Sequence, residues 1–73
     1  MIIVMKAEFG PESPETQSVV RAAERFPGIQ TQLHVIQGAT RTLTEIYLLG
    51  PTTSISSEPF EEIAAVEKVI RIR

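Results

Sequence analysis

The sequence contains no cysteine, no tryptophan and only one histidine, His34, and these absences remove several kinds of chemistry. Without thiols the chain cannot form disulfides or hold a thiolate-bound metal or an iron–sulfur cluster. A single imidazole cannot form the multi-histidine sites typical of zinc and copper. We therefore expect no cofactor in this chain.

Basic residues and long apolar runs are also scarce. The 7 Lys and Arg residues against 9 Asp and Glu residues give a net charge of -2, which lacks the broad basic surface that phosphate backbones need. The opening run Met1–Met5 is too short to span a membrane and lacks the charged start and cleavage site of a signal peptide. We expect a cytoplasmic protein that binds neither nucleic acid nor membrane.

The length of 73 residues predicts one small domain over residues 1–73. A core of this size supplies only a few kcal/mol of stability, so covering one further apolar face with a partner would matter. We therefore predict a homo-oligomer or docking on another domain.

Local signals divide the chain into six elements. The run Ile2–Ala7 predicts a strand, and Ser13-Pro14-Glu15 predicts the start of a helix that continues to about Phe26. From Ile29 the apolar residues alternate, which predicts a second strand, and a turn over residues 37–40 leads into a third strand over residues 41–49. A loop over residues 51–55, a helix of about two turns near residues 56–64 and a last strand over residues 66–73 complete the order.

The order βαββαβ predicts an α+β fold of the ferredoxin-like type. Its four strands form one antiparallel sheet with the first and third strands in the middle, and both helices cover one face. Because Ile2 and Val4 alternate with Ile3 and Met5, the first strand is apolar on both faces. We assign Ile3 and Met5 to the open face, as residues of a partner interface.

The chain lacks the groups of an enzyme. We find no Ser/His/Asp arrangement and no glycine-rich phosphate loop, and the adjacent Glu61 and Glu62 would diverge by about 100° on a helix. Tyr47 alone does not form the aromatic surface of an RNA-binding sheet. We expect no catalysis by this chain alone.

The stretch "HVIQGATRT", residues 34–42, places His34 and Arg41 on either side of a turn at Gly38. One interpretation is an ordinary hairpin with a surface histidine and a charge that protects a sheet edge. The other is the rim of a site in which a small ligand bridges the two side chains. Local pattern alone leaves both open.

Three segments, "MIIVMK", "HVIQGATRT" and "FEEIAAVEKVIRI", resemble the N-terminal ferredoxin-like domain of 3-deoxy-D-arabino-heptulosonate 7-phosphate (DAHP) synthase. That family is an aldol-type transferase of the shikimate pathway of aromatic amino-acid biosynthesis. Its (β/α)₈ barrel, absent from this chain, condenses phosphoenolpyruvate with erythrose 4-phosphate using a divalent metal. The resemblance implies an allosteric regulatory domain, in which phenylalanine or tyrosine binds between domains and closes them over the barrels. By this resemblance the chain ends where the linker to the barrel would begin, and we expect either an excised domain or a separately encoded regulator.

Matched to the family's hairpin, His34, Gly38, Arg41 and Thr42 are the implied effector-binding residues. Ile36 departs from the serine of tyrosine-responsive members and cannot form a side-chain hydrogen bond. We therefore predict either a preference for phenylalanine over tyrosine or loss of feedback. Two alternatives stay open: a dimerisation module without ligand, and a free-standing amino-acid-binding domain of the ACT type, for which Gly10 gives weak support.

Overall fold

The structure, a computed structural model, describes residues 1–71. The elements are, in order, β1 (Ile2–Met5), α1 (Pro14–Glu24), β2 (Gln30–Gln37), β3 (Thr42–Leu49), the short 3₁₀ helix η1 (Thr52–Ser54), α2 (Glu58–Glu61) and β4 (Val66–Ile70). The strands form one antiparallel sheet in the order β2-β3-β1-β4. This confirms the predicted ferredoxin-like fold, with the first and third strands in the middle.

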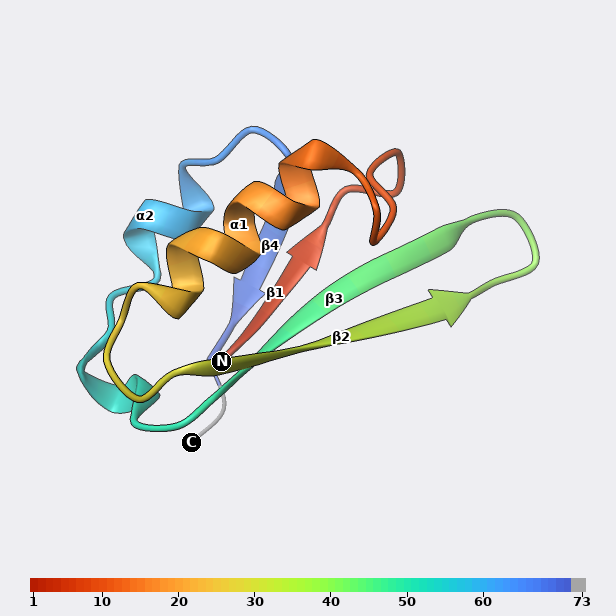
Figure 1. Cartoon of the computed structure of the whole chain (residues 1–73). Coiled ribbons are helices and arrows are strands. Elements are labelled where there is room, and N and C mark those ends of the chain that lie inside the picture. The colour runs from red at the N-terminus through yellow and green to blue at the C-terminus, as the bar shows by residue number, and fades with distance from the viewer. Residues whose placement is uncertain (72–73) are drawn as a thin grey trace.

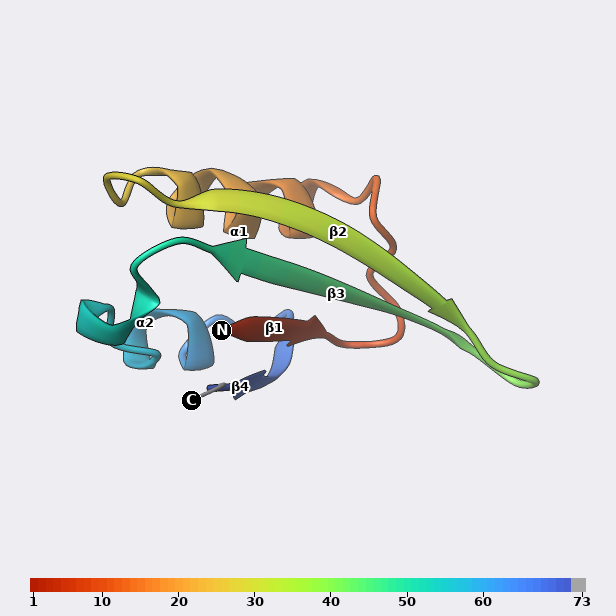
Figure 2. The same ribbon diagram turned by 90° about the horizontal axis from the view of Figure 1, so that it is seen from below.

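Both helices lie on the same side of the sheet, and the other side carries no helix (Figures 1 and 2). The β2–β3 hairpin extends well beyond the rest of the molecule. Both of its strands are eight residues long, whereas β1 pairs with β3 only at residues 2–4. The outer part of the hairpin is therefore a two-stranded arm.

Helix α1 begins as predicted, because Ser13 caps it. The Ser13 hydroxyl accepts a hydrogen bond from the Thr16 N–H at 3.2 Å, and Pro14 occupies the first turn, where no N–H is needed. The helix ends at Glu24, two residues before the predicted end, and a turn at Gly28, whose φ is 79°, leads into β2.

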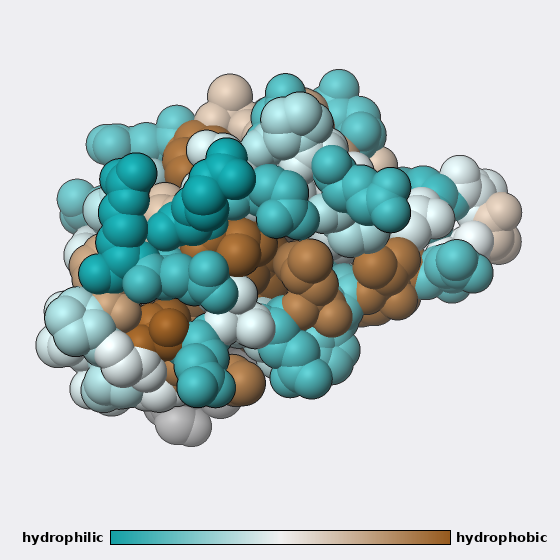
Figure 3. All heavy atoms as spheres, in the orientation of Figure 1, coloured by the Kyte–Doolittle hydropathy of each residue, from teal (hydrophilic) through white to brown (hydrophobic). Residues whose placement is uncertain are grey.

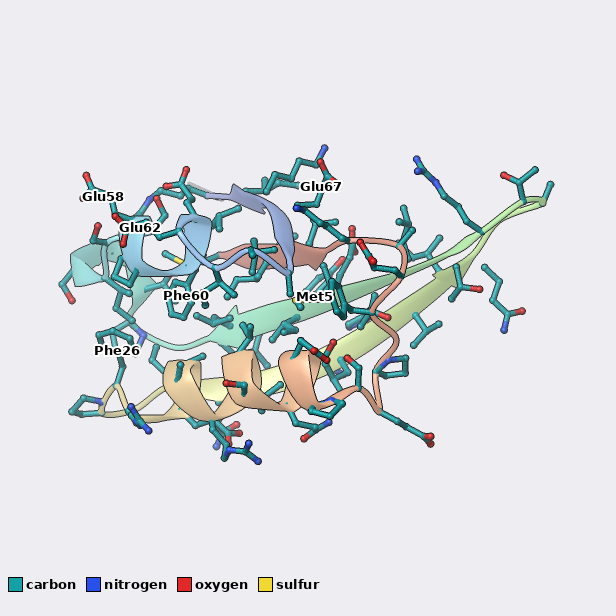
Figure 4. The ribbon with its side chains drawn as sticks, turned by 90° about the horizontal axis from the view of Figure 1, so that it is seen from above. Met5, Phe26, Glu58, Phe60, Glu62 and Glu67 are labelled. Atoms are coloured by element: carbon teal, nitrogen blue, oxygen red, sulfur yellow. The ribbon has the colours of Figure 1, made fainter. Side chains whose placement is uncertain are left out.

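The core lies between the sheet and the helices. Val19 and Ala23 of α1 are fully buried in it, and the rings of Phe26 and Phe60 pack with centroids 6.2 Å apart. Figure 4 shows these two rings between the helices, while Glu58 and Glu62 point outward. One face of α1 therefore belongs to the core.

Ile3 and Met5 correct the predicted interface. Both side chains are fully buried in the core, so neither can contact a partner, and the assignment of this pair to the open face is wrong. The two pairs of residues do lie on opposite faces of β1, as predicted, but Ile3 and Met5 lie on the face that the helices cover. Since residues opposite each other on paired strands share a face, Ile2 lies on the open face with its partners Tyr47 and Ile70.

The last part of the chain is more irregular than predicted. The predicted loop over residues 51–55 contains the short helix η1. Helix α2 has one turn rather than the two predicted. In place of its second turn, two tight turns follow, in which the Ile63 N–H donates to the Phe60 carbonyl and the Val66 N–H donates to the Ile63 carbonyl. The β4 strand ends at Ile70, and the predicted strand residues 72–73 lie outside the described residues.

Candidate functional site

The open face of the β2–β3 hairpin carries the histidine of the predicted site. The Gly38 N–H donates to the Arg41 carbonyl at 2.8 Å, which closes the turn and sets the pairing of the two strands. From this pair the two strands stay in register without a shift, so that His34 lies opposite Glu45 and Ile36 lies opposite Leu43. The two-residue turn therefore decides which β3 side chains surround His34.

His34, Tyr47 and Glu45 form a cluster on this face. The imidazole stacks on the phenol ring of Tyr47 with centroids 4.1 Å apart and planes at 30°. The Tyr47 hydroxyl donates to Glu45 Oε1 at 3.3 Å. His34 is exposed, whereas Tyr47 and Glu45 are half-buried. The cluster thus offers an aromatic surface with a carboxylate at its side.

Apolar surface adjoins the cluster toward the hairpin tip. The Ile36 side chain is 47% exposed, and its cross-strand partner Leu43 is half-buried beside it. Figure 3 views the molecule from the side rather than onto this open face, and it shows further hydrophobic side chains along the hairpin between α1 and the hairpin tip. An aromatic ring placed against His34 could extend over Ile36 without meeting a side-chain hydrogen-bonding group there.

Arg41 and Gly38 form the far end of the predicted site. The alternation of side chains places Arg41, the residue just before β3, on the same face as His34, four residues before Glu45 and toward the hairpin tip. Four residues of strand span about 13 Å, so the two side chains do not touch directly. A ligand, together with the length of the arginine side chain, is needed to connect them.

Thr42 lies on the other face of the hairpin. It pairs with Gln37, and this pair alternates with Thr44, whose side chain is buried on the helix-facing side. The structure therefore brings His34, Ile36, Gly38 and Arg41 onto one face but does not bring the Thr42 side chain to them.

Glu45 and Tyr47 are the site residues that the sequence analysis missed. The sequence did contain a signal for Glu45, because a two-residue turn at Ala39-Thr40 requires His34 and Glu45 to pair. The stacking of His34 on Tyr47 is diagonal rather than directly cross-strand, and no local pattern indicates it.

The residues described, 1–71, contain no group of three or more His, Asp or Glu side chains arranged to hold a metal ion. Within the same part of the chain, no helix has the length and apolar character to cross a membrane. What the hairpin does present is an imidazole, a phenol, a carboxylate and a guanidinium around apolar surface. These groups can contact a ring, a cation and a carboxylate.

The fold and this exposed hairpin define a small ferredoxin-like α+β domain with a solvent-facing polar and aromatic cluster. The whole chain, residues 1–73, matches the family model of the DAHP synthase ferredoxin-like domain, and the chain belongs to that family. It corresponds to the non-catalytic part of the synthase. A comparison with curated proteins finds no match.

Proposed function

We propose that this chain is a regulatory domain of DAHP synthase that binds an aromatic amino acid on the open face of the β2–β3 hairpin. The observation that supports this most directly is the His34–Tyr47–Glu45 cluster beside exposed Ile36. A solvent-facing imidazole stacked on a phenol is a flat surface for a third aromatic ring. Bound effector would act by favouring one arrangement of the domain relative to its partners.

Each part of an amino acid has a counterpart on this face. The Glu45 carboxylate can accept from an ammonium group, and the Arg41 guanidinium can donate to a carboxylate. The ring would lie against His34 and Ile36. Since Ile36 offers no partner for a phenolic hydroxyl, binding tyrosine there would leave that hydroxyl without a side-chain hydrogen bond, and phenylalanine is the preferred effector.

Calorimetric titration of the 73-residue chain with phenylalanine, tyrosine and tryptophan tests this function. We expect saturable binding, tighter for phenylalanine than for tyrosine, and a loss of about tenfold or more in affinity for His34→Ala. Gln30→Ala is the matched control, because Gln30 is exposed on the same face of the same strand but pairs with Leu49 at the other end. Equal affinity for phenylalanine and tyrosine would contradict the selectivity, and no binding of any of the three would contradict the function.

An assembly module without ligand is the second candidate. It is supported by apolar side chains on the open face away from His34, where Leu49 is 45% and Ile70 is 38% exposed. Such a module would associate in solution. The original chain would not bind amino acids, so His34→Ala would have no affinity to reduce. An ACT-type domain has less support, since Gly10 has a negative φ and open space around it, so its turn does not require glycine.

A further inference from the structure

The two edges of the sheet differ in how they are protected against pairing with another strand. The β4 edge is five residues long, contains the charged residues Glu67 and Lys68, and has an irregular register opposite Val4 and Met5. These features are typical of edges that avoid further pairing. The β2 edge has eight residues, QTQLHVIQ, with no proline and no Asp, Glu, Lys or Arg, and pairs with β3 without a bulge.

Exposed apolar side chains gather on the same unprotected strand. Among residues 1–71, five large hydrophobic residues are exposed, and β2 contributes Leu33, Val35 and Ile36, with 38%, 45% and 47% exposure. Leu33 and Val35 lie on the helix-facing side and Ile36 lies on the open side. A partner packed on one face would cover only part of this set, whereas a strand placed beside β2 would contact side chains on both faces.

The backbone of β2 presents a regular row of unpaired groups along this edge. Gly38 and Arg41 form a hydrogen-bonded pair, and such pairs alternate along an antiparallel ladder. The N–H and C=O groups of Ile36, His34 and Gln32 therefore point to β3. Those of the residues between them, Thr31, Leu33, Val35 and Gln37, point away from the sheet.

We propose that β2 pairs antiparallel with β2 of a second copy of this chain, about a two-fold axis at His34. This register places Leu33 opposite Val35 of the second copy and Thr31 opposite Gln37, so that on the helix-facing side apolar residues meet apolar and polar residues meet polar. On the open side, Gln32 lies opposite Ile36 of the second copy, beside the pair of His34 residues. All four outward-pointing residues of each strand then form hydrogen-bonded pairs. The interface is isologous, and the two four-stranded sheets become one continuous sheet.

The pairing of the two β2 strands needs no bound amino acid and does not depend on the proposed function. Only its role in regulation rests on the proposed function. The pairing specifies the edge rather than the open face as the contact between copies. It also places the two His34 side chains next to each other on the open face, so that an effector there would lie beside both copies.

Sedimentation equilibrium of the full 73-residue chain without added amino acid tests the pairing. We expect a mass of twice 8.1 kDa that falls to the monomer value on dilution. Val35→Pro removes only an outward-pointing N–H, a place where edge strands tolerate proline, and should weaken the dimer by about tenfold or more. Leu33→Lys should weaken it similarly, by placing a charge opposite the apolar Val35 of the second copy.

Ile70→Lys is the matched control, because Ile70 has the same 38% exposure as Leu33 but lies on β4 and on the open face. It should leave the dimer unchanged, and circular dichroism should show that every variant is folded. In amide hydrogen exchange, dimerisation should slow exchange at Thr31, Leu33, Val35 and Gln37.

A chain that stays monomeric at millimolar concentration would overturn the edge pairing. So would a dimer that Ile70→Lys disrupts and Leu33→Lys does not, because that dimer uses the open face. Neither result bears on effector binding, which the calorimetric titration of His34→Ala measures separately.

Discussion

The imidazole of His34 stacks on the ring of Tyr47 with the ring centroids 4.1 Å apart, although the residue directly opposite His34 in the sheet is Glu45. The contact is therefore diagonal across the two strands, and Tyr47 is held in place by its hydrogen bond to Glu45. As a result, the histidine of the family's hairpin has an aromatic support beneath it rather than open solvent on both sides.

Replacing Tyr47 tests whether this support contributes to binding. Tyr47→Leu should lower the affinity for phenylalanine about three- to tenfold, because it removes an aromatic contact of about 0.5–1.5 kcal/mol that holds the imidazole. Tyr47→Phe keeps the ring and loses only the bond to Glu45, so its affinity should stay within about twofold of the original. Calorimetry measures both, and an equal loss in the two variants would show that the hydroxyl rather than the ring matters.

Arg41 and Thr42 are neighbours in the chain but lie on opposite faces of the hairpin. Arg41→Ala should reduce effector affinity by about tenfold, because it removes the cation available to the amino-acid carboxylate. Thr42→Ala is the control and should have little effect, since its side chain is on the helix-facing side. A larger effect of Thr42→Ala in the same titration would contradict the placement of the site on the open face.

Much of the fold follows from local signals in the sequence. The helix start at Ser13 and the alternation in the strands were sufficient for the element order and the ferredoxin-like topology. The hairpin shows the limit of such signals. The alternating apolar residues that begin at Ile29 include Leu33 and Val35, yet of these three only Ile29 is buried, because the strand extends beyond the helices that would cover it.

The same limit explains the errors at the site. Ile3 and Met5 were placed on the wrong face because β1 is apolar on both, and only the packing of the helices decides which side becomes the core. Thr42 was included with Arg41 because both match the family's hairpin motif, although adjacent strand residues point in opposite directions. Glu45 was missed because the predicted turn and strand were not converted into a cross-strand pairing, which places Glu45 opposite His34.

Gly28 and Gly50 bring two turns into close contact. Gly50 has a φ of 127°, and a Cβ atom there would collide with the carbonyl oxygen of Gly28. Gly50→Ala should therefore lower the free energy of unfolding by about 2 kcal/mol or more in urea denaturation. Gly10→Ala is the control: its φ is negative and its surroundings are open, so stability should stay the same or rise by up to about 1 kcal/mol. Equal effects would contradict the close approach.

Thr44 has a buried hydroxyl. The residue is 1% exposed, and its Oγ1 has no hydrogen-bond partner within residues 1–71. Since a buried hydroxyl without a partner is costly, Thr44→Val should raise the free energy of unfolding by about 1 kcal/mol, seen as a higher urea midpoint with an unchanged slope. A fall in stability would show that the hydroxyl does have a partner in solution.

The most direct test of the effector site is an NMR titration of the isotope-labelled 73-residue chain with phenylalanine, following the backbone amide shifts. The proposed function predicts saturable shifts that are largest at His34, Glu45 and Tyr47 and continue to Arg41, with tyrosine producing the same pattern at higher concentration. Shifts confined to α1 and α2, or none at saturating phenylalanine, would contradict the site on the open face of the hairpin.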